Sequence, residues 1–118
     1  MKEELFNYNN NTYDVGFENN PFVSLYVVRD KLSGLVISEV IKCKNDLVAM
    51  KGFKDFVDKK QADDRDFSVY SLDLIGLLNE ETAELDKSVE HQEICDSRDD
   101  LKDIIEKATA FVLAQLED

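Results

Sequence analysis

The sequence predicts an α+β domain in which a small antiparallel sheet carries two helices packed on one face. Residues 22–42 have the composition of two strands joined by a tight turn. A helix is expected directly after this hairpin, and residues 97–118 contain the most regular helical pattern of the chain. With a third strand, and a weaker fourth one, between the two helices, the predicted order is ββαβ(β)α.

The hairpin consists of strands at Phe22–Arg29 and Leu35–Lys42, which are rich in β-branched and aromatic side chains. The turn Asp30–Gly34 separates them, and Gly34 suits a backbone position with positive φ. In the following helix, Asn45 is the expected N-cap. Its apolar stripe is predicted to consist of Ala49, Met50, Phe53, Phe56 and Val57.

The second half of the chain predicts a third strand at Phe67–Leu78, whose alternating pattern slips near Tyr70. A bulge or a break at Tyr70 would explain the slip. Residues 83–87 are expected to return as a short edge strand, and residues 88–95 as strand or extended coil.

The last helix is expected to be capped by Ser97, with Asp100 three residues later. Its apolar stripe predicts core packing, and part of it could instead form a dimer seam or a groove for a partner. The candidate partner contacts on this stripe are Leu101, Ile105, Ala108, Val112 and Leu116.

Residues 1–21 are rich in Asn, which predicts a flexible arm ahead of a single domain at residues 22–118. Tyr13, Val15 and Phe17 alternate, however, as a short strand would. An ordered edge strand is therefore the alternative for this arm.

The charge of the chain is unevenly distributed. The net charge is −12, and residues 61–118 carry all of it, with 17 acidic and five basic residues. Residues 22–60 instead have a net charge of +3, with eight basic and five acidic residues. Non-specific binding to duplex DNA is disfavoured because the field of the whole molecule repels phosphate. The acidic half suits a basic partner or a solvated surface.

The composition predicts no enzyme, no cofactor and no metal site. His91 has no nucleophile recognisably paired with it, and the acidic residues Asp63, Asp64 and Asp66 lack the Gly and Glu of a calcium loop. Cys43 and Cys95 do not form a disulfide framework, which favours a reducing, cytoplasmic location. The chain contains no evident signal peptide and no apolar run long enough to span a membrane.

Aromatic and basic residues on or beside the hairpin form a candidate surface for single-stranded nucleic acid. Bases stack on aromatic rings, and phosphates pair with cations. The candidates are Phe22, Tyr26, Arg29, Lys31, Lys42 and Lys44. Core packing of the aromatic residues is the competing interpretation.

Several short motifs between residues 22 and 82 follow one another in an order and spacing that a known protein family shares. They are Phe22, the run 26–34 (YVVRDKLSG), the run 44–46 (KND), Ala49, Phe53, Phe56, the pair 66–67 (DF), Tyr70, Gly76 and the run 80–82 (EET). In order and spacing they resemble the small non-structural protein of gokushovirus-type microviruses, which are tailless phages with circular single-stranded DNA. Ala83, where the family usually has Gly, departs from the pattern, as does a longer interval between Tyr70 and Gly76.

The resemblance implies a non-enzymatic phage accessory protein in the host cytoplasm, equated by genome position with the microvirus packaging protein C. Such a protein acts in viral single-stranded DNA synthesis or genome packaging through protein–protein contacts. The implied partners are phage replication or procapsid proteins or a host replication factor, with a homodimer as a further expectation. The alternative function is a single-stranded DNA-binding module that uses the hairpin of residues 22–44.

Overall fold

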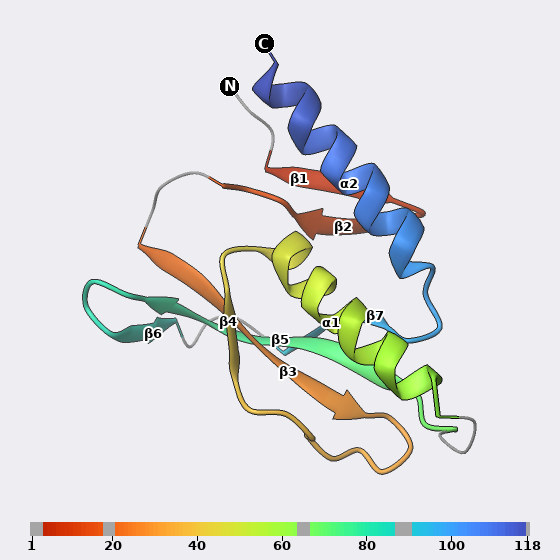
Figure 1. Ribbon diagram of the computed structural model, residues 1–118. Helices are drawn as coiled ribbons and strands as arrows, with labels where there is room; N and C mark the ends of the chain where they lie inside the picture. The colour runs from red at the N-terminus through yellow and green to blue at the C-terminus, as the bar shows by residue number, and fades with distance from the viewer. Residues whose placement is uncertain (1–3, 18–20, 64–66, 87–90, 118) are drawn as a thin grey trace.

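The computed structural model describes residues 4–17, 21–63, 67–86 and 91–117. The predicted α+β class is confirmed (Figure 1). Along the chain the elements are β1 (Leu5–Tyr8), β2 (Asn11–Asp14), β3 (Phe22–Asp30), β4 (Ile41–Cys43), α1 (Asp46–Gln61), β5 (Tyr70–Asn79), β6 (Glu84–Asp86), β7 (Gln92–Asp96) and α2 (Leu101–Leu116).

The strands form a two-stranded sheet, β1-β2, and a five-stranded antiparallel sheet in the order β4-β3-β5-β6. Strand β7 pairs with β5 along residues 71–74, whereas β6 pairs with residues 77–79 of the same strand. The long strands β3 and β5 are therefore the centre of the sheet. In Figure 1, α1 crosses these strands on one side, and α2 lies beside the β1-β2 hairpin.

The first predicted strand matches β3, but the second one is shorter than expected. Only residues 41–43 form β4, and a single further bridge joins Arg29 to Val36. Between them the Ser38 hydroxyl, rather than a backbone carbonyl, accepts the hydrogen bond from the Val28 N–H. A side chain that replaces a ladder bond ends regular pairing. Residues 37–40 therefore follow β3 without forming a strand. The predicted Gly34 turn is confirmed, with φ of +76°.

Helix α1 forms as predicted. The Asn45 side chain accepts the N–H of Val48, which satisfies one of the free donors at the helix start. Residues Ala49, Met50, Phe53 and Val57 are buried against the sheet, and Phe56 is half-buried.

The slip near Tyr70 marks a break, because β5 begins there. Two further irregularities were not predicted: Ile75 is an extra residue of β5 opposite β3, and Ile94 is an extra residue of β7 opposite β5. The short edge strand is confirmed as β6. Of the segment predicted as strand or coil, residues 92–95 belong to a strand, β7, and residues 88–90 lie outside the described residues.

The predicted Ser97 cap is wrong. Helix α2 begins at Leu101, and the side chain of Asp100 accepts the N–H of Asp103. Ser97 is used elsewhere, because its hydroxyl accepts the N–H of Tyr70 at 3.0 Å. The hydrogen bond from the Ser97 N–H to the Tyr70 carbonyl makes the contact reciprocal and fixes the chain that leads into α2.

The predicted flexible arm is also corrected, within residues 4–17. These residues form the β1-β2 hairpin, and Tyr13 and Val15 are each only 2% exposed. The turn contains Asn9 and Asn10, both with positive φ. Asn adopts this conformation more readily than most residues, so the Asn-rich composition here reflects a hairpin turn. The ordered alternative is thus the one that the structure contains.

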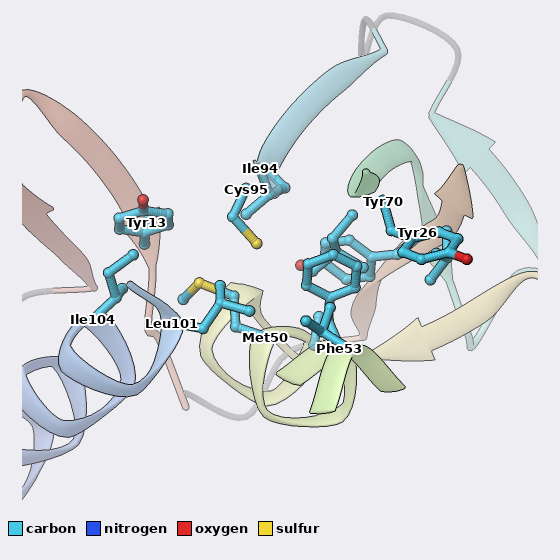
Figure 2. Close-up of a cluster of buried hydrophobic side chains, with 13 residues drawn as sticks. Tyr13, Tyr26, Met50, Phe53, Tyr70, Ile94, Cys95, Leu101 and Ile104 are labelled. Atoms are coloured by element: carbon cyan, nitrogen blue, oxygen red, sulfur yellow. The ribbon is translucent and has the colours of Figure 1, made fainter. Parts of the chain in front are cut away.

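The core lies between the five-stranded sheet and the two helices (Figure 2). Tyr26 and Leu72 of the sheet meet Met50 and Phe53 of α1, while Leu101 and Ile104 join the same cluster from α2. Tyr13 enters it from β2. Both helices therefore contribute to one core on one face of the sheet, as predicted.

Candidate interaction surfaces

One of the two aromatic residues of the predicted nucleic-acid surface, Tyr26, is not at the surface. Tyr26 is 0% exposed and lies in the core, so its ring is not available for stacking on a base. Its hydroxyl donates a hydrogen bond of 2.6 Å to the Asp46 carboxylate. Burial next to this carboxylate raises the pKa of Tyr26 far above its usual value.

Three of the predicted basic contacts are paired with carboxylates. Arg29 Nε lies 3.0 Å from Asp73 Oδ2. Lys31 Nζ lies 2.7 Å from Glu93 and 3.4 Å from Asp96, and Lys42 Nζ lies 2.8 Å from Glu80. A phosphate would have to compete with these carboxylates for each cation. The positive charge of the hairpin is thus neutralised by residues that follow it in the chain.

Phe22 and Lys44 lie in an acidic environment. Phe22 is exposed and lines two shallow hollows of about 230 and 420 Å³. The first hollow contains Lys44 together with Glu4 and Asp14. The second is lined by Phe22, Asn79, Glu84, Leu85 and Asp86. A base stacked on Phe22 would bring its phosphate towards these carboxylates, which disfavours nucleic acid at this position.

His91 belongs to a charge cluster that was not predicted. Its Nε2 lies 2.7 Å from Asp73 Oδ2, the same oxygen that contacts Arg29. Burial alone would raise the pKa of Asp73, but the side chains of His91, Ser71 and Arg29 together outweigh it and hold the pKa below its usual value. The other carboxylate oxygen, Oδ1, is buried without a hydrogen-bond partner among the described residues. Sequence gave no signal for this cluster, because Arg29 and Asp73 are 44 residues apart.

Burial disfavours the thiolate form of both cysteines. Cys43 lies between two lysines, and these would favour a thiolate if the thiol were fully exposed. It is half-buried, however, and burial raises its pKa. Cys95 is buried in the core, and its pKa is raised further, chiefly by burial.

Among the described residues no group of three or more His, Cys, Asp or Glu is placed to hold a metal ion. Asp64 and Asp66 of the acidic loop lie outside the described residues.

The predicted partner stripe of α2 is mostly used inside the molecule. Leu101 and Ala108 are buried, and Ile105 and Val112 are half-buried against the core. Of the five predicted contacts, only Leu116 is exposed. The first turns of α2 are therefore a structural part of the fold, and only its last turns can meet a partner.

A second apolar surface lies on the segment after β3, and we call it the 32–40 surface. Its exposed side chains are Leu32, Leu35, Val36, Ile37 and Val40. Leu32 is 71% exposed at the turn, and the others follow along the edge of the sheet up to β4. The sequence contained a signal for it, because both alternating faces of residues 35–42 hold apolar residues.

Comparison with family models, curated proteins and solved structures finds no match to this chain. Among the described residues, neither helix is long and apolar enough to cross a membrane.

Proposed function

We propose that this chain is a non-enzymatic phage accessory protein that acts in viral single-stranded DNA synthesis or genome packaging by contacting other proteins. The sequence resemblance supplies the biological setting. The contact mode rests on one observation: the hairpin of residues 22–44 exposes apolar side chains, whereas Arg29, Lys31 and Lys42 are paired with carboxylates. Exposed apolar surface favours a protein partner over a phosphate backbone.

The 32–40 surface is the proposed contact site. It lies at the β4 edge of the sheet, where a partner can bury several neighbouring side chains at once. The sequence resemblance names three classes of partner: the phage replication initiator, the procapsid and a host replication factor. Cross-linking in infected cells, followed by identification of the attached protein, distinguishes these classes.

The test replaces Leu35 and Val40 together by Asp in the phage gene. Both side chains are exposed, so the fold is expected to remain intact while the apolar contact is lost. The yield of viral single-stranded DNA and of packaged genomes should fall several-fold, with an unchanged amount of the protein. Leu85→Asp is the matched control, because Leu85 is 56% exposed but lies on β6, at the opposite edge of the sheet. Unchanged yields in the double variant would refute the proposal.

A fluorescence titration with labelled single-stranded DNA tests the alternative function. We expect no binding at low salt. Binding that weakens steeply as salt rises would instead favour the DNA-binding module.

A further inference from the structure

The last turns of α2 are apolar on the side that faces away from the molecule. In the first half of the helix the outward positions are charged, as Lys102, Glu106 and Lys107 show. In the second half they are Ala110, Leu113 and Ala114, and Leu113 is 53% exposed. A helix that is apolar on all sides is normally buried on all sides.

The inward side of the same turns is already occupied. Phe111 packs on Phe6 of β1 with ring centroids 5.4 Å apart, and Val112 borders the small cluster around Ala108. The apolar residues on the exposed side are therefore not needed for packing within the molecule. Figure 1 shows these turns extending past β1, away from α1 and the five-stranded sheet. They form an accessible helical face at one end of the molecule.

The absence of charge on this face narrows the choice of partner. Residues 108–116 contain no charged residue, although 34% of the chain is charged. A basic partner would find no carboxylate to pair with on this face, whereas the rest of the surface is acidic. Two copies of an acidic chain, in contrast, repel each other least where neither carries charge.

We propose that the exposed face of Lys107–Glu117, which presents Ala110, Leu113 and Ala114, pairs with the same face of a second copy in an antiparallel helix pair whose midpoint is level with residue 112. In that arrangement the small residues Ala110 and Ala114 face each other across the two-fold axis, which lets the helices approach closely. Leu113 lies beside Ala110 of the other helix, because both are on the exposed face. Lys107 lies opposite Glu117 of the other copy, so both ends of the pair are complementary in charge.

The expected dimer is weak. The paired segment is three helical turns, or about 15 Å long. Such a contact buries less than the roughly 800 Å² per partner of a standard stable interface. The association is therefore expected in the micromolar range or above. Glu106 lies at the rim of the contact, where it stays in water.

Sedimentation equilibrium of the full chain from micromolar to millimolar concentration tests the proposal. The mass should rise from monomer to dimer with concentration. Leu113→Glu should weaken association by about tenfold or more, because a charge replaces the central apolar contact. Leu85→Glu is the matched control, since Leu85 is equally exposed on β6, and it should leave association unchanged.

A charge exchange tests the direction of the pair. Lys107→Glu and Glu117→Lys should each weaken association about two- to tenfold, and the double variant should recover it. Circular dichroism confirms that each variant keeps its helices, which is needed because Lys107 also pairs with Asp103 within α2. A chain that stays monomeric, a dimer insensitive to Leu113→Glu, or a double exchange without recovery would each overturn the proposal.

Discussion

The hydroxyl of Tyr26 donates a 2.6 Å hydrogen bond to Oδ1 of Asp46, inside the core. Oδ2 of the same carboxylate accepts the backbone N–H of Asp14 at 2.8 Å. One side chain in the first turn of α1 therefore joins β3 of the large sheet to β2 of the N-terminal hairpin. This carboxylate is one reason why residues 4–17 are part of the folded domain.

Tyr26→Phe should lower the free energy of unfolding by about 1–3 kcal/mol, because it leaves a buried carboxylate oxygen without its donor. Urea unfolding measures the change. Tyr8→Phe is the matched control: it removes a hydrogen bond of the same length, 2.6 Å, to the partly exposed Asp103. Water can replace that donor, so the loss should be smaller. Equal losses in both variants would contradict the role assigned to Tyr26.

Asp46 should make the protein less stable as the pH rises above 3.8. Burial raises its pKa from the usual 3.8, and the hydrogen bonds from Tyr26 and Asp14 only partly oppose this. The folded state thus holds the proton more tightly than the unfolded state. Its contribution to stability is fully present below 3.8 and is lost as the pH rises through the folded pKa.

Asp46→Asn should remove this part of the pH dependence. An Asn side chain can still accept the N–H of Asp14 through its oxygen and donate to the Tyr26 hydroxyl through its nitrogen. Thermal unfolding between pH 3.5 and neutrality, roughly the range over which such a group titrates, should show a flatter curve than the parent chain. An identical slope in the two proteins would contradict the prediction.

Ala83→Gly should stabilise the protein. Ala83 has φ of +61°, a left-handed conformation that costs a residue other than Gly about 1–2 kcal/mol. Gly loses about 0.5–1 kcal/mol more backbone entropy on folding, so the net gain should be about 0.5–1 kcal/mol. Ala62→Gly is the control. Because Ala62 has φ of −69°, Gly relieves no strain there, and the substitution should destabilise the protein. A loss of stability in Ala83→Gly would contradict the observed turn.

The thiols should react in a fixed order with an aromatic disulfide reagent at neutral pH. Cys43 is half-buried and should react slowly, whereas Cys95 is buried and should react only after denaturation. Burial raises the pKa of both thiols, which keeps them protonated and unreactive. Variants with Ser at either position identify which thiol reacts. Rapid reaction of Cys43 in the native protein would mean that Lys42 and Lys44 activate it after all.

Local sequence pattern was sufficient for the α+β class, β3, α1 and α2. Each of these elements is defined by residues close in the chain, through side-chain alternation, helical spacing and the Asn45 cap. The same local logic failed where a polar residue had a distant partner. Ser97 bonds Tyr70 instead of capping α2, and Ser38 bonds Val28 and interrupts the second strand.

The candidate surfaces were predicted less well, for the same reason. A stripe on α2 identifies apolar residues but not which of them the rest of the fold covers, so Leu101 and Ala108 were predicted as contacts although they are core. The basic residues of the hairpin are visible in the sequence, but their carboxylate partners follow 38 to 65 residues later.

The sequence by itself therefore determined the elements and the uneven charge of this protein, because backbone propensity and composition are properties of neighbouring residues. Only the tertiary structure decided that the Asn-rich start is a packed hairpin, that Tyr26 is a core residue, and that the side chains of the 32–40 surface stay exposed. Those outcomes depend on which distant groups meet on folding, since burial and ion pairing are set by contacts across the chain.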